Sequence, residues 1–561
     1  MSDQTDTTPR QPDSNGDRYH LLIEFAHKHL DFQIAELESV LDMHGISLGD
    51  DEECRIIALP NANKTKLKTR HGKTVQVHRV KDSGSGAVTS RRPFLILSLP
   101  RTSKWIPNND ETQTNNIASI ILERCTLVRN VMELWGMGTS IEECAMAAKD
   151  WIQNYTLGKL TFSRVSSESW KLTVHTLGAK YTYEEQGVMR SHVSHLGFSG
   201  PVQMKDPTNE YVLIHEIELN ETGSPLYPRH SPEGKIISEN DARPPIACYF
   251  ARTLCGTRQH KGRGKEQYSL KNRTYLGPTS MDAELSSIMT NLGHCKEGTI
   301  AFDPFVGTGS ILLSCALRGA FCIGTDIDFR ILKGRSKDEN IESNFRQFNL
   351  PKPELIRSDN SIHHRHFRTT SPMYDAIICD PPYGIRAGAR KSGSRLTNPK
   401  PVPEDQRHDH IAQTRPYPVS DVMADLLDVA ARNLVLGGRL VYIIPSYADF
   451  DDECDLPRHE CLRIVHICYQ PLGSELGRRM VTMEKIGEYD VSKRETHYLV
   501  STWVNGPESA EKCANIREKI LENAKLKPGY ESKLEIRKQK RKANKEAKRI
   551  AKRAAADNFT D

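Results

Sequence analysis

Apolar runs alternate repeatedly with helix-like segments between about residues 246 and 505. The apolar runs are short enough to be strands, and the segments between them carry apolar residues at helical spacing. Strand–helix units repeated in this way predict an α/β fold, in which a parallel, doubly wound sheet carries helices on both faces. The expected strands are 299–305, 321–328, 376–384 and 439–446, and the expected helices are 310–320, 340–348 and 422–438.

The N-terminal half has the pattern of smaller α+β modules, with strand-like runs and amphipathic segments in closer succession. Residues 118–148 have a helical period throughout and are expected to be helical. Gly45 follows another amphipathic segment and is expected to end its helix. The expected strands are 21–26, 54–60, 94–100, 170–178 and 211–218, and the other expected helix is 32–45.

The charge of the chain is concentrated in two segments. The net charge is only +5, but residues 54–104 carry +11 and residues 533–553 carry +9, so the remaining 489 residues carry −15. Basic segments of this kind either face polyanions such as nucleic acid or form solvated surface. Charge alone leaves both interpretations open.

Composition excludes several classes of protein. With 37% hydrophobic and 27% charged residues, the chain is neither collagen-like nor wholly disordered. It has no run of 18 uncharged apolar residues, and residues 1–20 are polar, so we expect neither a membrane span nor a secretory signal. The 13 cysteines form no CxxC pair, and the Cys and His residues between 454 and 468 match no standard zinc spacing. We therefore expect reduced thiols and no metal site.

A glycine-rich turn, DPFVGTGS, runs from Asp303 to Ser310 between an expected strand and an expected helix. Gly307 and Gly309 allow the backbone to turn sharply and to approach a ligand closely. Ser310 is able to cap the helix that follows. The alternative is a strand-to-helix turn with a purely structural role, and the neighbouring motifs weaken that alternative.

Acidic residues end the next two expected strands. Asp326 lies 23 residues after Asp303, which is the spacing of an acid that binds ribose hydroxyls beyond a glycine-rich turn. Asp328 lies where the following helix begins and is expected to favour the helix dipole rather than a ligand. Asp359 ends the next strand, where a ligand and an ordinary surface position are equally plausible interpretations.

The sequence DPPYG, Asp380 to Gly384, ends the strand that begins at residue 376. Proline fixes the backbone and removes N–H donors, so carbonyl acceptors remain exposed. The Asp380 carboxylate and the Pro381 carbonyl are able to accept two hydrogen bonds from an exocyclic amine. Tyr383 is able to stack on a base, a contact worth about 1–3 kcal/mol. A plain turn is the disfavoured alternative.

Taken together, these motifs resemble a known family. Residues 303–310 and 380–384 are similar to motifs I and IV of class I S-adenosylmethionine-dependent methyltransferases that act on amino groups. Residues 271–286 resemble the extra motif that precedes the glycine loop in THUMP-containing RNA methyltransferases. Residues 19–41 resemble the opening of the catalytic subunits of the eukaryotic tRNA (guanine(10)-N2)-methyltransferases. The similarity runs from about residue 19 to 505.

The resemblance implies a role for each motif residue. The glycine loop would hold the methionine part of S-adenosylmethionine, Asp326 the ribose and Asp359 the adenine amine. The residues after the fourth strand would hold the target guanine. The implied cofactor-binding residues are Asp303, Gly307, Thr308, Gly309, Asp326 and Asp359, and the implied catalytic residues are Asp380, Pro381, Pro382 and Tyr383.

The resemblance also implies a domain organisation. It comprises a Rossmann-like class I methyltransferase domain that follows two α+β modules, one ferredoxin-like and one THUMP-like. The expected boundaries are 1–17 for a disordered tail, 18–110 for the ferredoxin-like module, 111–225 for the THUMP-like RNA-binding domain, 226–265 for a linker, 266–505 for the methyltransferase domain and 506–561 for a basic tail.

The implied activity is N2-methylation of a guanosine in tRNA, at position 10 by resemblance, with S-adenosylmethionine as methyl donor. The implied partners are tRNA and a small zinc-binding activator subunit, in the cytoplasm. Two other functions stay open: adenine N6-methylation of DNA or another RNA, and non-catalytic RNA binding through a vestigial fold. The basic tail is interpreted as an RNA-binding arm, a nuclear localisation signal or a solvated helix. The loop 386–418 either closes over the tRNA or is disordered.

Overall fold

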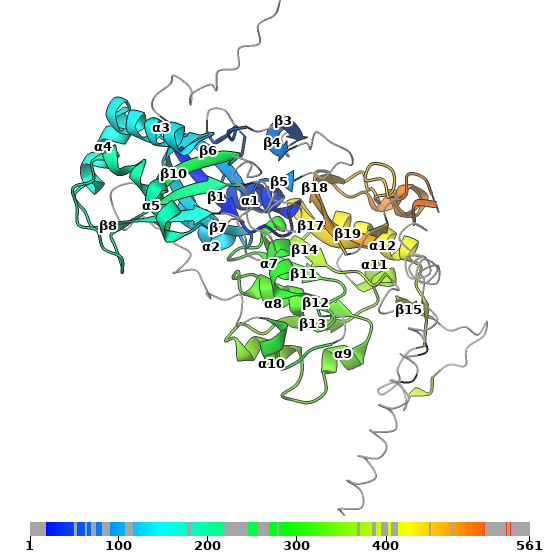
Figure 1. Cartoon of the computed structure of the whole chain (residues 1–561). Helices are drawn as coiled ribbons and strands as arrows, with labels where there is room; N and C mark the ends of the chain where they lie inside the picture. The colour runs from blue at the N-terminus through cyan, green and yellow to red at the C-terminus, as the bar shows by residue number, and fades with distance from the viewer. Residues whose placement is uncertain are drawn as a thin grey trace, which may run out of the picture.

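The computed structural model contains two seven-stranded sheets, one in each half of the chain (Figure 1). Two smaller sheets of two and three strands accompany them. The described residues are 18–49, 53–61, 64–68, 74–80, 90–106, 116–176, 181–217, 245–255, 269–277, 280–366, 371–383, 389–393, 402–404, 413–447, 450–472, 476–506, 508–510, 535 and 539.

The C-terminal sheet has the order β13-β12-β11-β14-β17-β19-β18. Strands β13, β12, β11, β14 and β17 are mutually parallel, and β19 is antiparallel to both of its neighbours. Such a sheet requires crossover helices, and these confirm the predicted α/β, doubly wound fold. Its strands are β11 (Ile300–Asp303), β12 (Phe321–Asp326), β13 (Glu354–Arg357), β14 (Tyr374–Cys379), β17 (Leu434–Tyr447), β18 (Leu462–Pro471) and β19 (Leu476–Lys485).

Helices cover both faces of this sheet, and alternate residues of each strand face different helices. In β14, Ala376 and Ile378 pack into the core that contains α7 and α8, whereas Ile377 and Cys379 pack into the core under α12. Burial on both faces explains why these strands are continuous apolar runs. The described α-helices of this half are α7 (Ala283–Leu292), α8 (Ser310–Ala316), α9 (Phe329–Lys333), α10 (Ile341–Gln347), α11 (His363–His366), α12 (Val419–Asn433) and α13 (Leu499–Ser501).

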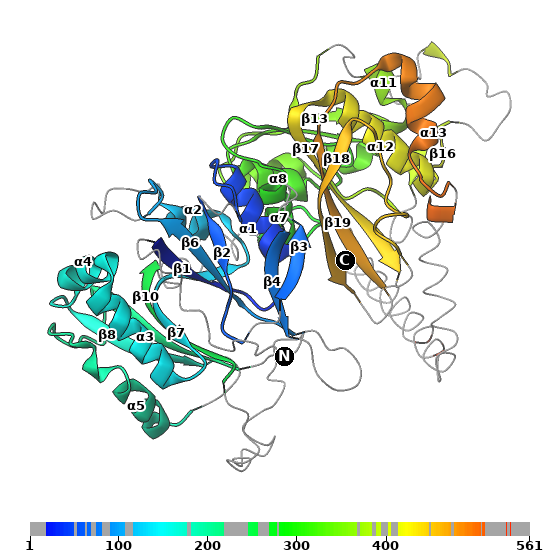
Figure 2. The ribbon, with the colours of Figure 1, turned by 90° about the horizontal axis from the view of Figure 1, so that it is seen from above.

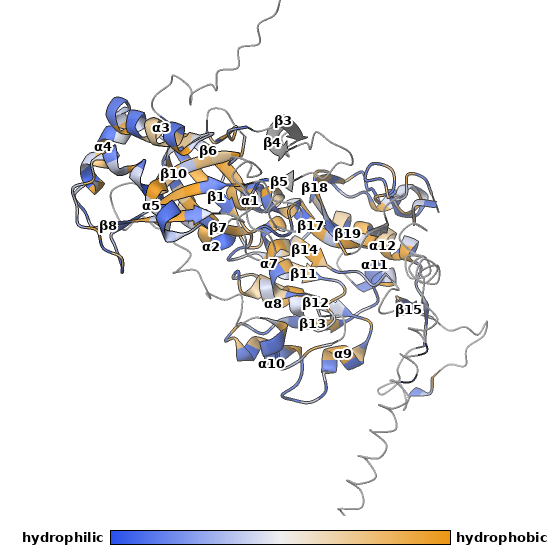
Figure 3. Cartoon of the chain, in the orientation of Figure 1, coloured by the Kyte–Doolittle hydropathy of each residue, from blue (hydrophilic) through white to orange (hydrophobic). Residues whose placement is uncertain are grey.

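The N-terminal sheet has the order β2-β6-β1-β7-β10-β9-β8, with only β8 and β9 paired in parallel. Its central strands are apolar, whereas the outer surfaces of its helices are polar (Figure 3). The strands are β1 (Arg18–Phe25), β2 (Arg55–Ile57), β6 (Phe94–Pro100), β7 (Val128–Gly138), β8 (Trp170–Thr176), β9 (Asn209–Glu216) and β10 (Ala247–Cys255). The helices are α1 (Phe32–Asp42), α2 (Ile117–Arg124), α3 (Ile141–Asn154), α4 (Thr156–Val165) and α5 (Tyr183–Ser191), and the three-stranded sheet comprises β3 (Lys64–Lys68), β4 (Thr74–Val80) and β5 (Ser90–Arg91).

Two sequence-based expectations for this half are wrong. The segment 118–148 is not helical throughout, because the 11-residue strand β7 separates α2 from α3. Both faces of β7 are buried, as the neighbouring residues Val131 and Met132 pack into different cores, so its apolar residues do not alternate with polar ones. The predicted linker 226–265 contains β10, which lies between β7 and β9 inside the sheet.

Helix α1 joins the two halves and packs against α7 (Figure 2). The buried Glu36 carboxylate of α1 accepts the backbone N–H groups of Thr126 and Leu127 at 2.8 and 2.9 Å. It also accepts the side-chain amide of Asn291 from α7 at 2.8 Å. A buried carboxylate with three donors is stable only while all three stay in place, so this contact fixes the two sheets relative to each other.

Several expectations lie outside the described residues. These are the tail 1–17, most of the basic tail 533–553, parts of the basic segment 54–104, Gly384 and most of the loop 386–418. Within the described ranges, no helix combines the length and the apolar character that crossing a membrane requires.

Candidate functional site

The four acidic motif residues meet at one edge of the C-terminal sheet. Strands β13, β12, β11 and β14 are adjacent and parallel, so their carboxyl ends point the same way (Figure 1). Asp303 and Asp326 are the last residues of β11 and β12, whereas Asp359 and Asp380 follow β13 and β14. In open α/β sheets, ligands bind at this edge, where the order of the strands reverses.

The glycine turn connects β11 to α8, and its backbone conformation requires glycine at two positions. Gly307 has φ +49° and Gly309 has φ +77°. A Cβ atom at Gly309 would lie 2.7 Å from Cγ2 of Ile341, which is fully buried in α10. The expected cap by Ser310 is wrong: Gly309 precedes the helix, and the Ser310 hydroxyl accepts a hydrogen bond from Arg273 at 2.9 Å.

The Asp326 carboxylate supports this turn. Its Oδ2 accepts the backbone N–H of Gly307 at 3.1 Å, and its Oδ1 accepts that of Asp328 at 2.8 Å. Burial raises the pKa of Asp326 above its ordinary value, against these hydrogen bonds, which lower it. Asp328 caps α9 through the backbone N–H of Arg330 at 3.0 Å, as the sequence predicts.

Asp303 is the most deeply buried acid of the site, with about 1% of its surface exposed. Burial raises the pKa of its carboxyl group well above the usual range, and the nearby charges of Asp326 and Asp380 raise it further. The backbone N–H of Phe305 donates to Asp303 at 2.9 Å and opposes that shift. These three acids lie at one edge of the sheet and are partly shielded from water, so together they form a site with a strong preference for a positively charged ligand.

Asp359 has structural contacts on both carboxylate oxygens. Oδ1 accepts the backbone N–H and the hydroxyl of Ser361 at 2.9 and 2.8 Å, and thereby caps η3 (Asn360–Ile362). Oδ2 accepts the backbone N–H of Ser392 at 2.6 Å, from the short strand β15 (Arg390–Ser392). A carboxylate has about four acceptor positions, so one further donor fits.

The residues after β14 lie directly at the edge. Asp380 and Pro382 are half-buried, and Pro381 is buried. Tyr383 is about 8% exposed and packs into the core under α12, so most of its ring contacts protein. The four expected catalytic residues are therefore adjacent to the acids on β11 and β12, with Tyr383 held firmly by its packing.

The glycine-loop motif alone does not predict two further residues of this edge. Arg273 is buried beside the first residue of α8, and burial lowers its pKa to about 10. The Ser280 hydroxyl lies 2.7 Å from the hydroxyl of Thr308 in the turn. Both belong to the segment 271–286, whose resemblance to an extra motif was the signal that pointed to them.

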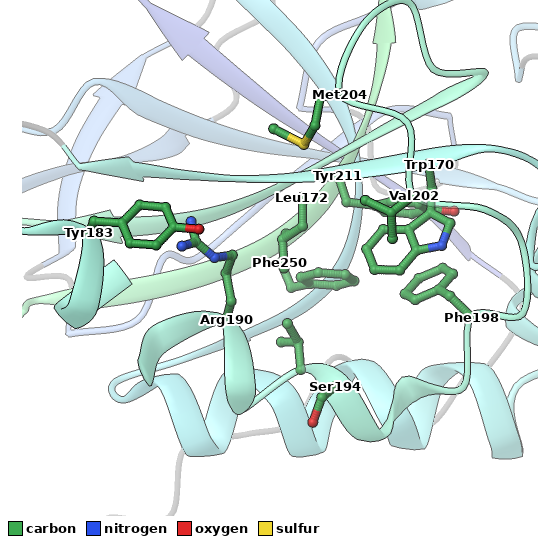
Figure 4. A pocket seen from close by; sticks show the side chains of 11 residues that line it. Trp170, Leu172, Tyr183, Arg190, Ser194, Phe198, Val202, Met204, Tyr211 and Phe250 are labelled. Atoms are coloured by element: carbon green, nitrogen blue, oxygen red, sulfur yellow. The ribbon is translucent and has the colours of Figure 1, made fainter. Parts of the chain in front are cut away.

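A cavity of about 300 Å³ lies elsewhere, in the N-terminal sheet (Figure 4). It is lined by Trp170, Phe198, Tyr211 and Phe250, with Arg190 as its single charged residue. This lining contains no acid, cysteine or histidine, and its side-chain hydroxyl groups belong to Tyr183, Ser194 and Tyr211. Across the described segments, no three His, Cys, Asp or Glu side chains are grouped as around a metal ion.

Two sequence families match the chain. Residues 271–399 match the family described as "RMKL-like, methyltransferase domain", and residues 110–240 match the "Tmrp11 THUMP N-terminal domain". The protein "tRNA (guanine(10)-N(2))-methyltransferase TRMT11" of Homo sapiens is 33% identical over 497 residues, which are 86% of this chain and 91% of that protein. Its namesake in Dictyostelium discoideum is 35% identical over 493 residues, 85% of this chain and 84% of that protein.

Solved structures also resemble this chain. The crystal structure of TrmN from Thermus thermophilus matches 83% of this chain and 100% of its own, at 15% identity and a TM-score of 0.33. The structure of SMU.472, a putative methyltransferase complexed with SAH, matches 85% of this chain and 99% of its own, at 11% identity and a TM-score of 0.34.

Proposed function

The chain belongs to the family of the tRNA (guanine(10)-N(2))-methyltransferases, and from this premise we propose that it methylates N2 of guanosine 10 in tRNA. The methyl donor is S-adenosylmethionine. The observation that carries the proposal is the sheet edge at which Asp303, Asp326 and Asp380-Pro381 meet. This edge offers carboxylates to the positively charged methyl donor and, beside them, hydrogen-bond acceptors to the target amine.

The residues of the edge fit the methyl donor. A Cβ atom at Gly307 would meet only the carbonyl oxygen of Phe305, at 3.9 Å, so this part of the turn is open and its backbone is able to approach a ligand directly. The raised pKa values of Asp303 and Asp326 are those of acids that lack a positive charge nearby. Bound S-adenosylmethionine supplies a methyl group already activated on a sulfonium. We assign Asp303, Gly307, Thr308 and Gly309 to its methionine part, Asp326 to the ribose and Asp359 to the adenine amine.

We assign the target amine to the residues after β14. The lone pair of guanine N2 is delocalised into the ring, which makes the amine a poor nucleophile. Acceptance of both N–H bonds by the Asp380 carboxylate and the Pro381 carbonyl would pull N2 toward tetrahedral geometry and localise that pair. Pro382 fixes the backbone of these acceptors, and Tyr383 bounds the base. Positioning supplies much of the remaining rate enhancement.

The decisive experiment replaces Asp380 by Ala. We expect single-turnover methylation of tRNA to be lost, while the affinities for S-adenosylmethionine and tRNA stay close to those of the wild type. Asp375→Ala is the matched control, because Asp375 lies in β14, the strand that Asp380 follows, but is exposed and accepts the backbone N–H of Ile300. Near-normal transfer by the Asp380 variant would overturn the assignment of the site.

Two rival functions are tested by cheaper measurements. An adenine N6-methyltransferase of DNA would also use Asp-Pro-Pro-Tyr, but the match of residues 110–240 to a THUMP domain favours RNA. Parallel assays on tRNA and duplex DNA distinguish the two. A non-catalytic RNA-binding protein would show no thermal stabilisation by S-adenosylmethionine, whereas we expect a clear stabilisation.

We assign RNA gripping to the N-terminal half, with a ferredoxin-like module at 18–110 and a THUMP-like domain at 111–225, and methyl transfer to 266–505. By its family resemblance the chain would work with a small zinc-binding activator subunit. Co-expression with candidate activators, followed by size-exclusion chromatography and zinc analysis, tests that partnership. We place the protein in the cytoplasm, and imaging of the chain with and without residues 533–553 tests nuclear import through the basic tail.

A further inference from the structure

A buried histidine connects helix α12 to the short helix that Asp359 caps. His363 is the first residue of α11, which directly follows η3 and lies beside α12 (Figure 1). The side chains of His363 and of Asp428 on α12 have no exposed surface. Nε2 of His363 lies 2.8 Å from Oδ2 of Asp428, and Nδ1 lies 2.9 Å from the backbone carbonyl oxygen of Asn360. One imidazole ring thus links α12 to η3.

The partners of His363 determine which of its nitrogens carry hydrogen. The carbonyl oxygen of Asn360 only accepts hydrogen bonds. Burial raises the pKa of Asp428, but hydrogen bonds, among them that from His363, lower it to about 2, so this carboxylate is ionised and also only accepts. Both ring nitrogens therefore donate, and the hydrogen bond to Asp428 joins two charged groups. Such a bond between buried groups is strong and holds the ring in one orientation.

Asp428 is itself held in place. The Tyr489 hydroxyl donates to its Oδ1 at 2.6 Å, and Nε of Arg494 donates to its Oδ2 at 2.8 Å. Each carboxylate oxygen therefore has a donor other than His363. Asp428 also lies within α12, a helix of 15 residues that is buried along most of its length. The acid is thus a fixed point to which the histidine ties the neighbouring segment.

The segment that His363 supports has few hydrogen bonds of its own. η3 is a 3-10 helix of three residues, and hydrogen bonds in such a turn have poor geometry. Its own bond runs from the Ile362 backbone N–H to the Asp359 carbonyl at 3.1 Å. The bond from His363 to the Asn360 carbonyl comes in addition, from a ring that α12 holds. It therefore fixes the position of η3 relative to the rest of the domain.

The Asp359 side chain takes its orientation from η3. Its Oδ1 accepts the backbone N–H and the hydroxyl of Ser361, the middle residue of η3, at 2.9 and 2.8 Å. Its Oδ2 accepts the backbone N–H of Ser392 in β15, which pairs with β16 (Thr414–Pro416). A displacement of η3 would move the donors on Oδ1 but not the donor on Oδ2, and would thus turn the carboxylate. The acceptor position that remains for a ligand would then point in another direction.

We propose that His363 and Asp428 are positioning residues, which hold η3 so that the Asp359 carboxylate faces the adenine amine of S-adenosylmethionine. This inference rests on the proposed function, since it takes Asp359 to bind that amine. Neither His363 nor Asp428 touches the cofactor in this arrangement. Their contribution is selectivity for adenine, because a purine without the 6-amino group gains nothing from a well-placed carboxylate.

The test compares the binding of two ligands to the full chain. S-adenosylhomocysteine carries the 6-amino group, whereas S-inosylhomocysteine has a carbonyl oxygen in its place. We expect the wild type to prefer the adenosyl compound by at least about tenfold, as for one hydrogen bond to a charged group. His363→Gln, whose amide reaches Asp428 but not Asn360, should weaken binding of the adenosyl compound by about tenfold without weakening that of the inosyl compound. His363→Asn, whose amide nitrogen takes the place of Nδ1, should keep most of the preference.

His459→Gln is the matched control. His459 is also buried in this domain, but its Nδ1 accepts the backbone N–H of Cys461 and makes no contact with η3. This variant should have a lower thermal midpoint and the wild-type preference between the two ligands. A purely structural role of His363 would likewise lower the midpoint, or weaken the binding of both ligands equally. An unchanged preference in folded His363→Gln would overturn the inference.

A double-variant cycle tests whether His363 acts through Asp359. Asp359→Ala should remove the preference, and His363→Gln should add no further loss in that background, because both changes affect the same contact. Additive losses would overturn the inference. If the wild type binds both ligands equally, the assignment of Asp359 to the adenine amine fails, and this inference fails with it. Methylation of tRNA by the wild type, measured separately, shows whether the proposed function holds in that case.

Discussion

Gly307 donates its backbone N–H to the Asp326 carboxylate at 3.1 Å, and this bond ties the glycine turn to the end of the neighbouring strand. The two residues come from different motifs, 19 positions apart. One acid thus has two tasks in the proposed site: it holds the turn in place, and it offers acceptor capacity to a ribose. The local shape of the site and its ligand chemistry depend on the same side chain.

Replacement of Asp326 by Ala should therefore weaken S-adenosylmethionine binding strongly, by at least about tenfold, because the loss of one hydrogen-bonded charge costs about 1.5–3 kcal/mol. Isothermal titration calorimetry measures this effect. Asp328→Ala is the control: it removes a partly exposed helix cap and should lower stability slightly without changing cofactor affinity. Equal losses of affinity in the two variants would contradict a specific role for Asp326.

Gly309→Ala should destabilise the protein through two separable effects. Gly309 and Gly437 have the same φ, +77°, but a Cβ atom at Gly437 meets nothing within 4 Å, whereas at Gly309 it meets buried Ile341 at 2.7 Å. Gly437→Ala should cost only the backbone strain of about 1 kcal/mol. Gly309→Ala should cost about 2–3 kcal/mol, because steric overlap adds to the strain.

Urea denaturation of both glycine variants separates these effects, and cofactor affinity provides a second readout. We expect only Gly309→Ala to weaken S-adenosylmethionine binding, since Gly437 lies in β17, away from the glycine turn. If the two variants have the same urea midpoint and the same affinity for S-adenosylmethionine, then the close packing of the turn on α10 is not the reason that glycine is required at position 309.

The candidate edge was predictable because its signals are local. Each motif acid directly ends or follows an apolar run, and parallel strands bring their carboxyl ends together. Asp303, Asp326 and Asp380 therefore meet as the sequence predicts. The roles of individual residues in binding stay predictions, and the experiments above address them.

The N-terminal sheet was harder to predict because its strands lack a distinctive period. Strand β7 is buried on both faces, and an unbroken apolar run of that kind resembles a buried helix in sequence. Strand β10 follows a segment rich in proline and charge, whose composition predicted a linker, yet long-range pairing with β7 and β9 determines its structure.

Contacts between segments that are far apart in the sequence could not be predicted from any local sequence pattern. The bond from Ser392 to Asp359 spans 33 positions, and that from Asn291 to Glu36 spans 255. No spacing rule relates such residues, because their neighbourhood depends on the packing of whole elements. The hydrogen bond between Ser392 and Asp359 and the contact of α1 with α7 through Glu36 and Asn291 were therefore visible only in the structure.

Cofactor binding should release protons, with Asp303 as a main source. Burial raises the pKa of Asp303 well above its usual range, and Asp326 and Asp380 raise it further. A cationic ligand favours the ionised form, so affinity for S-adenosylmethionine should rise with pH, by up to about tenfold per pH unit for each proton released. Calorimetry in buffers of different ionisation enthalpy between about pH 6 and about pH 8 measures the number of protons.

Asp303→Asn provides the control, because an amide releases no proton on binding. Its affinity should be lower and should vary less with pH than that of the wild type. S-adenosylhomocysteine, which lacks the sulfonium charge, should release fewer protons. A wild-type affinity that does not change with pH would show that Asp303 keeps the same protonation state in the free and the bound protein.

Asp425 and Asp428 of α12 should have opposite effects on stability. Burial raises the pKa of Asp425 to about 6 from 3.8, so the folded protein binds this proton more tightly than the unfolded chain. The stability that this group contributes is fully present below about pH 4 and is lost as the pH rises through about 6. Asp425→Asn should therefore be about 1–2 kcal/mol more stable than the wild type at about pH 8, and no more stable at about pH 5.

Asp428→Asn is the matched control on the same helix. Asp428 is also buried, but hydrogen bonds from His363, Tyr489 and Arg494 lower its pKa to about 2. Its contribution to stability is present above about pH 4 and is lost only as the pH falls through about 2, so its replacement should destabilise the protein at both about pH 5 and about pH 8. Urea midpoints of the three proteins at the two pH values measure both effects. A loss of stability for Asp425→Asn at about pH 8 would mean that the attraction between Asp425 and Arg494, 3.8 Å apart, outweighs the cost of burying that carboxylate.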